Sequence, residues 1–171
     1  MVCMLLAGVG CNTAPKSEEG RENLVSNADS ALKQMTAADP SLQNFINRGY
    51  GYAIFPKVGK GAWIVGGAYG RGAVYEQGQF IGYADISQAT VGLQAGGQTY
   101  MQLLVFENKD ALERFKSGKL TFAANVSAVI LKSGAAESAK FTDGIAVFVN
   151  PIGGAMVEAA LGGQQFTFQP K

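Results

Sequence analysis

The sequence predicts an α+β fold: a single domain in which two or three helices pack on a curved, mainly antiparallel sheet. Partial closure of this sheet into a barrel is an alternative that the sequence does not decide. Helical spacing of apolar residues is found mainly in residues 21–48, and short runs rich in β-branched and aromatic residues, separated by glycines, make up most of the rest. With 171 residues, 47% of them hydrophobic, the chain is long enough to bury a core without disulfides.

Two helices are expected near the N-terminus. In residues 21–36, apolar side chains recur every three or four positions, as in one buried helical stripe. Asp39 and Pro40 then offer a cap and a first-turn proline for a second helix, which ends at Gly49. We expect both helices to pack on the sheet.

Strands and turns are expected to follow. Residues 52–55 form an apolar run that Pro56 should end, residues 57–61 resemble a glycine turn, and residues 62–65 resume the strand composition. Residues 76–79 predict a hairpin connection to a strand at 80–84. The remaining expected elements are a helix capped by Asn108 and ended by Gly118, a polar loop at 133–142, and strands at 90–106, 120–132, 144–149, 155–161 and 165–168, where 120–132 is ambiguous because of its alanines.

The positive charge is concentrated in one part of the chain. Residues 40–75 contain four basic residues and no acidic one, although the whole chain has a formal net charge of only +1. Three of the four lie within the glycine-rich stretch 49–75, at Lys57, Lys60 and Arg71. We interpret the glycines there as positions where strands bend, with aromatic neighbours filling the space that the glycines leave.

The same stretch carries a resemblance to a known family. Residues 55–75, F-P-K-V-G-K-G-A-W-I-V-G-G-A-Y-G-R-G-A-V-Y, resemble the signature of the SYLF domain. Residues 90–98, T-V-G-L-Q-A-G-G-Q, and the T-D-G of residues 142–144 are similar to two later segments of that family. The resemblance implies a lipid-binding domain of the kind found in bacterial lipoproteins and in eukaryotic proteins of the membrane and actin cortex. It also implies, as an alternative to packing, that the first N-terminal helix contacts the membrane, which the acidic polar face of that helix opposes on anionic lipid.

The candidate lipid-binding residues are Lys57, Lys60, Trp63, Tyr69 and Arg71. The two lysines flank the expected glycine turn, the arginine can contact a phosphate through two N–H groups, and the aromatic rings suit the headgroup boundary. The alternative is that Trp63 belongs to the core and that the lysines only solubilise a hairpin. For the two lysines the family resemblance favours binding, whereas for Trp63 we favour a place in the core.

The residue inventory argues against an enzyme. The chain has no histidine, and its two cysteines, Cys3 and Cys11, precede the expected domain, which removes the commonest general base, thiol nucleophiles and thiolate zinc sites. The glycine run at 67–72 inverts the order of a nucleotide-binding motif. No cofactor or metal is expected, and three cations are too few for a nucleic-acid partner.

Residues 1–11 resemble the end of a bacterial lipoprotein signal, with Cys11 as the lipidation site, although a basic start is missing and Gly8 stands where leucine is usual. An ordinary apolar N-terminus is the alternative. Residues 12–20 are expected to be a flexible tether, and residues 21–171 the domain.

The sequence therefore predicts an exported lipoprotein, anchored at the periplasmic face of a membrane, most simply the outer membrane, whose domain binds phospholipid without catalysis. The alternative is a scaffolding protein of the cell envelope that contacts another protein.

Overall fold

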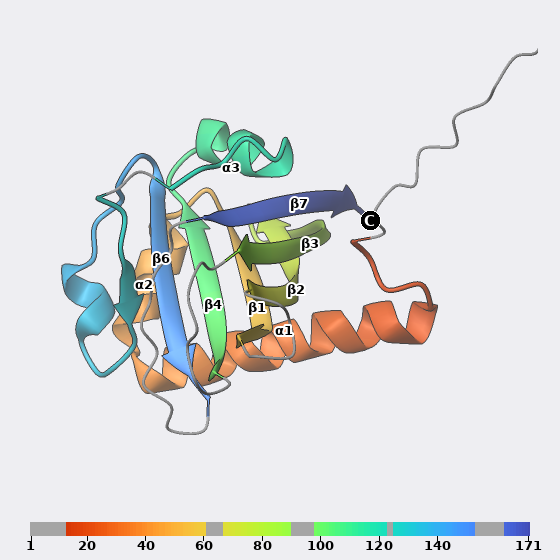
Figure 1. Cartoon of the computed structure of the whole chain (residues 1–171). Coiled ribbons are helices and arrows are strands. Elements are labelled where there is room, and N and C mark those ends of the chain that lie inside the picture. The colour runs from red at the N-terminus through yellow and green to blue at the C-terminus, as the bar shows by residue number, and fades with distance from the viewer. Residues whose placement is uncertain (1–12, 61–66, 90–97, 123–124, 153–162) are drawn as a thin grey trace, which may run out of the picture.

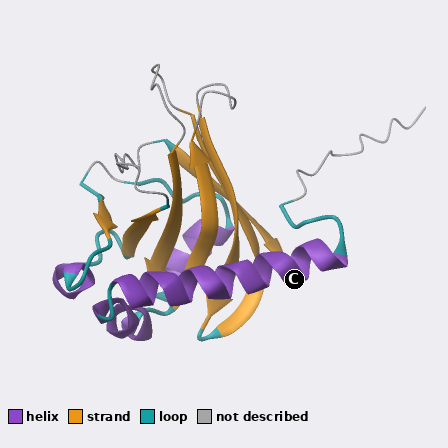
Figure 2. Cartoon of the chain, turned by 90° about the horizontal axis from the view of Figure 1, so that it is seen from below, coloured by secondary structure: helices purple, strands orange, loops and turns teal. Residues whose placement is uncertain are grey.

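The N-terminal helices form as expected in the computed structural model, which describes residues 13–60, 67–89, 98–122, 125–152 and 163–171. Helix α1 (Glu18–Ala38) is longer than its apolar stripe, because the Ser17 side chain caps it by accepting a hydrogen bond from the Gly20 N–H. Helix α2 (Ser41–Arg48) follows and ends at Gly49. Both lie on the same face of the sheet, and α1 runs across the strands (Figures 1 and 2).

The strands form one sheet of seven in the order β5-β6-β4-β1-β2-β3-β7 (Figure 1). Every neighbouring pair is antiparallel except β5 and β6. The α+β class is thereby confirmed, with three α-helices in the described residues. The strands are β1 (Gly51–Lys60), β2 (Gly67–Glu76), β3 (Gln79–Ala89), β4 (Gln98–Phe106), β5 (Ala128–Ile130), β6 (Ile145–Pro151) and β7 (Gln164–Pro170).

The sheet is strongly curved, and its two faces pack in different ways. On the inner, concave face, helix α3 (Lys109–Lys116) covers a cluster in which Phe55, Phe115 and Phe166 meet. On the outer face, α1 and α2 cover a second cluster. The curvature brings β4 and β7, which are not neighbours in the sheet, close enough for Gln102 and Gln164 to exchange two buried hydrogen bonds of 2.9 and 3.1 Å. Within the described residues the sheet stays open, with β5 and β7 as its edges.

Two expectations for strand β1 were wrong. The strand does not end at Pro56 but continues to Lys60, so Lys57 lies in a strand and not in a turn. A β-bulge at this point shifts the register against both neighbouring strands. Because a bulge leaves a residue out of the hydrogen-bond ladder, it can accommodate a proline that a regular central strand would exclude. The expected strand at 62–65 lies outside the described residues.

The role inferred for the glycines is confirmed at Gly72. A Cβ atom there would come within 2.5 Å of the Ile54 carbonyl oxygen and 2.7 Å of the Phe55 ring, so the ring occupies the space that the glycine leaves. The expected hairpin is also confirmed: Gln77 and Gly78 connect β2 to β3, both with positive φ.

The later part of the chain is less strand-rich than expected. The Asn108 cap of α3 is confirmed by its hydrogen bond from the Ala111 N–H, and Gly118 follows with a φ of 72°. Of residues 120–132, only β5 is a strand among those described. The polar loop after it contains a short 3-10 helix, η1 (Ala135–Ser138), and residues 155–161 lie outside the described part.

The segment before α1 packs against the sheet. Thr13 and Ala14, within the stretch expected to be a tether, are both buried. The Ala14 N–H donates to the Gln169 side chain at 3.0 Å, and the Thr13 and Thr167 hydroxyls are 3.2 Å apart. The first residues that the structure describes therefore lie against β7.

Candidate functional site

Three of the predicted site residues meet on the outer face of the sheet. Lys57 on β1 pairs with Arg71 on β2, and Arg71 pairs with Asp85 on β3, which pairs with Thr167 on β7. Residues directly opposite one another in a sheet point to the same face, so these four side chains form one line across four strands, here called the polar row. Tyr69 lies beside it, two residues before Arg71 on the same strand.

The polar row is open to solvent at the β1 and β2 end. Lys57 is exposed, the Tyr69 side chain is among the exposed large hydrophobic ones at 40%, and the Arg71 side chain is 41% exposed. Within the described part of the chain, Lys57 takes part in no ion pair. It therefore offers a full positive charge to a ligand.

Arg71 is held by its neighbours. Its Nε donates to the Tyr69 hydroxyl at 3.0 Å and lies 3.6 Å from Oδ1 of Asp85, a distance that gives attraction without a hydrogen bond. The Asp85 side chain is only 15% exposed. The arginine is thus fixed in place, and part of its charge is balanced by the carboxylate.

The pKa of Asp85 is raised, because burial disfavours its charged form. The positive charge of Arg71 and the nearby hydroxyl groups of Tyr69 and Thr13 oppose this rise without cancelling it. When Asp85 is ionised, Lys57, Arg71 and Asp85 together carry a net charge of +1, so the polar row favours an anion only moderately.

The other predicted site residues cannot be placed in the same way. Lys60 ends β1, and its side chain is outside what the structure describes, as are Trp63 and Cys11 altogether. Asp85 and Thr13 are part of the site but were not predicted. The hairpin turn alone would pair Arg71 with Ala84; a bulge between Val74 and Tyr75 moves the register by one residue and brings Asp85 opposite the arginine.

No group of three or more histidine, cysteine, aspartate or glutamate side chains that could hold a metal ion occurs in the described ranges. None of the helices described there is both long and apolar enough to cross a bilayer.

Comparison with known proteins places the chain near one family. Residues 87–167 match the family model Ysc84, described as "Las17-binding protein actin regulator". This range includes the second and third segments of the SYLF resemblance, but not the signature at residues 55–75. Neither this match nor the relative below indicates an enzyme family.

A relative in Aeromonas veronii, "Beta cell expansion factor A", is 27% identical over 154 residues. The alignment covers 89% of this chain but 59% of the relative, so the chain spans little more than half of that protein's length. The resemblance to the SYLF family is thus confirmed: residues 87–167 carry the match to the Ysc84 (SYLF) domain, whose family is known for lipid binding or actin regulation.

Proposed function

We propose that this chain binds the anionic headgroups of phospholipids, without catalysis, through the polar row and Tyr69. The observation that carries the proposal is the exposed Lys57, which has no ion pair among the described residues and lies next to an arginine held in a fixed position. A lysine offers a mobile point charge, and the free N–H groups of the arginine can contact two phosphate oxygens at once. The tyrosine ring beside them suits the boundary between headgroups and acyl chains.

The expected attachment is weak. Each basic residue near an anionic membrane surface contributes about 1 kcal/mol, and Arg71 contributes less because Asp85 balances part of its charge. Two such contacts give binding that salt reduces, since they are mainly Coulombic.

A lipid anchor at Cys11 would reinforce this contact, as we propose for an exported lipoprotein held at the periplasmic face of a membrane. Thr13 is two positions after Cys11 in the sequence, a reach of at most about 7 Å. The Thr13 hydroxyl lies 3.2 Å from the hydroxyl of Thr167, which belongs to the polar row. An anchor attached there and the cations of the row would therefore approach the same membrane surface together.

The test is co-sedimentation of the full chain with vesicles, with Cys3→Ser and Cys11→Ser preventing lipidation. We expect binding to vesicles that contain phosphatidylglycerol, loss of binding at high salt, and little binding to phosphatidylcholine alone. Lys57→Glu should abolish sedimentation. The matched control is Lys119→Glu, which makes the same charge change at an exposed position after α3. Equal loss in both variants would show that only net charge matters.

A scaffolding role is the second candidate, favoured by one observation. Ile130 is 46% exposed on β5, an edge strand whose outer side has no neighbouring strand among those described. An exposed apolar side chain on a sheet edge suits a protein contact. Absence of vesicle binding under all conditions, together with self-association or partner binding that Ile130→Lys removes, would favour this role.

A further inference from the structure

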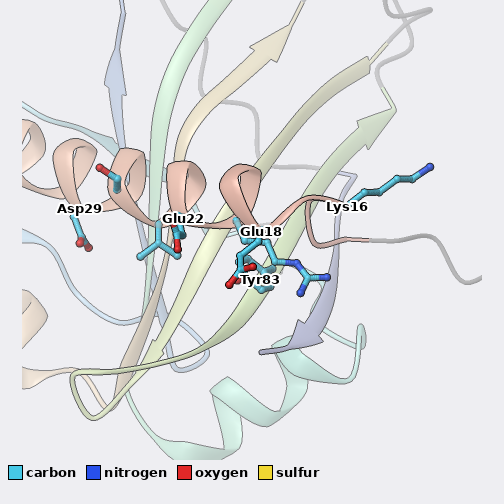
Figure 3. A pocket seen from close by; sticks show the side chains of 8 residues that line it. Lys16, Glu18, Glu22, Asp29 and Tyr83 are labelled. Atoms are coloured by element: carbon cyan, nitrogen blue, oxygen red, sulfur yellow. The ribbon is translucent and has the colours of Figure 1, made fainter.

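A cleft lies on the outer face, between α1 and β3 (Figure 3). Its volume is about 870 Å³, within the range usual for small-molecule sites. Tyr83 of β3 lines it, and residues of α1 and of the segment before α1 line the rest. The cleft shares no residue with the polar row.

Tyr83 gives the cleft a fixed aromatic wall. The side chain is 7% exposed, and its ring meets the Phe80 ring edge to face at 5.2 Å. Because packing already fixes this ring, a bound group can contact it without a further loss of side-chain entropy. Aromatic faces of this kind attract cations.

A guanidinium group lines the cleft towards the N-terminal end of α1. The Nε of Arg21 donates to the Pro15 carbonyl oxygen at 2.9 Å, which orients the side chain. Its two terminal nitrogens have no partner among the described residues and form the paired donors that a phosphate accepts. Lys16 also lines the cleft but reaches away from Tyr83 in Figure 3.

Carboxylates continue the lining along α1. Glu22, Val25 and Asp29 are three and four residues apart, so they share one side of the helix, and Figure 3 shows Glu22 and Asp29 on the same side of α1. Oδ1 of Asp29 accepts a hydrogen bond of 2.9 Å from the Tyr75 hydroxyl. That bond orients the carboxylate, and its second oxygen bonds to no other described residue.

We infer that this cleft binds a small molecule that carries both a phosphate and a primary amine, with the phosphate at Arg21 and the amine between Glu22 and the Tyr83 ring. A simple anion would be repelled by the carboxylates, and a simple cation by the arginine, whereas a zwitterion satisfies both. The N–H groups of a primary amine can donate to the carboxylates, which a quaternary ammonium cannot do. Such a group occurs free or as a lipid headgroup; only the lipid source rests on the proposed function.

The test is a ¹H–¹⁵N NMR titration of the full chain, carrying Cys3→Ser and Cys11→Ser, with O-phosphoethanolamine, inorganic phosphate and ethanolamine as separate probes. We expect O-phosphoethanolamine to bind at least about tenfold more tightly than either fragment, because it engages both groups at once. The largest shifts should fall on residues 21–29 and Tyr83. Equal affinity for inorganic phosphate, or shifts confined to the polar row, would overturn the inference.

Variants separate the two halves of the cleft. Glu22→Gln should weaken O-phosphoethanolamine about fivefold or more and leave inorganic phosphate unaffected, since a charge-assisted bond to the amine is lost. Arg21→Gln should remove binding of both phosphate compounds. Glu19→Gln, an exposed carboxylate of α1 that does not line the cleft, should change neither. Glu22 is exposed and has no bond to the rest of the fold among those described, so its substitution leaves folding intact.

Vesicles then identify the source of the ligand. If the cleft binds the headgroup of a lipid, the Lys57→Glu variant should bind to phosphatidylcholine vesicles once phosphatidylethanolamine is added to them. Adding Glu22→Gln to that variant should abolish the binding. Binding of soluble O-phosphoethanolamine without recruitment would assign a free ligand to the cleft. Sedimentation with anionic vesicles but no NMR response to O-phosphoethanolamine would overturn the inference that the cleft binds this ligand, and would leave the proposed function standing.

Discussion

Replacing Asp39 by alanine should destabilise the fold more than any exposed substitution, because this buried carboxylate joins three segments. The side chain is fully buried between α1 and α2. Its Oδ1 accepts hydrogen bonds from the Ser41 N–H and hydroxyl and from the Gly134 N–H, at 3.1, 2.6 and 3.1 Å, and its Oδ2 accepts one from the Ala136 N–H at 2.6 Å. The loop that contains η1 is thereby fixed to the junction of the two helices.

The magnitude follows from the donors that are left behind. Without the carboxylate, the backbone N–H groups of Gly134 and Ala136 lose their acceptor, and an unsatisfied buried donor costs about 1–3 kcal/mol. Asp39→Ala should therefore lower the free energy of unfolding by about 2–6 kcal/mol, a large part of the 5–15 kcal/mol typical of a domain. Ser41→Ala, the control, removes only the hydroxyl contact and should cost about 1 kcal/mol.

Urea denaturation followed by circular dichroism measures both variants, and an unchanged slope would show that the unfolded state is comparable. A loss below about 1 kcal/mol for Asp39→Ala would refute the reasoning, because water would then be satisfying the donors. The effect should also depend on pH. Burial acts to raise the pKa of Asp39, but the hydrogen bonds outweigh it and hold the pKa below the usual 3.8. Its stabilisation is thus present above pH 3.8 and is lost as pH falls through the folded-state pKa, so Asp39→Asn should flatten the acid limb of the stability curve.

Two further substitutions test the sheet and the site. Gly72→Ala should cost about 2 kcal/mol or more in urea denaturation, since the new methyl group meets the Ile54 carbonyl and the Phe55 ring; a neutral result would contradict the close packing. Asp85→Asn should strengthen co-sedimentation with phosphatidylglycerol vesicles by freeing the charge of Arg71, and weaker binding would show that the carboxylate positions the arginine. Because the pKa of Asp85 is raised, the ionised carboxylate destabilises the folded state at pH values above that pKa. As pH falls towards 3.8 and Asp85 becomes protonated, the free energy of unfolding of the wild type should therefore rise. Asp85→Asn should not show this rise.

Local signals in the sequence predicted much of this fold. The apolar stripe of α1, the Asn108 cap and the Gln77-Gly78 hairpin depend on residues within a few positions of one another, and all three are present. The pairing of Gly72 with an aromatic ring was inferred from composition and is also present. The first three features form wherever the local sequence favours them, because they need no distant partner.

Features that depend on sheet register were not predictable in the same way. A proline such as Pro56 usually ends a strand. Here a β-bulge accommodates it, and this bulge appears only when β1 is paired with both β2 and β4. The bulge at Val74 likewise decides whether Arg71 faces Asp85 or its neighbour. The site therefore contains the predicted Lys57, Tyr69 and Arg71, but as a line across strands instead of a turn.

The polar row can be tested most directly by asking which face of the domain touches the membrane. An environment-sensitive fluorophore is attached at Ser87→Cys, an exposed position opposite Tyr69, or at Ser117→Cys, an exposed position at the end of α3 on the inner side. Both proteins carry Cys3→Ser and Cys11→Ser, and each is mixed with phosphatidylglycerol vesicles. Our account predicts a blue shift and an intensity rise for the label at position 87 alone. A response at position 117 with none at position 87 would place the membrane on the opposite face and contradict the assignment.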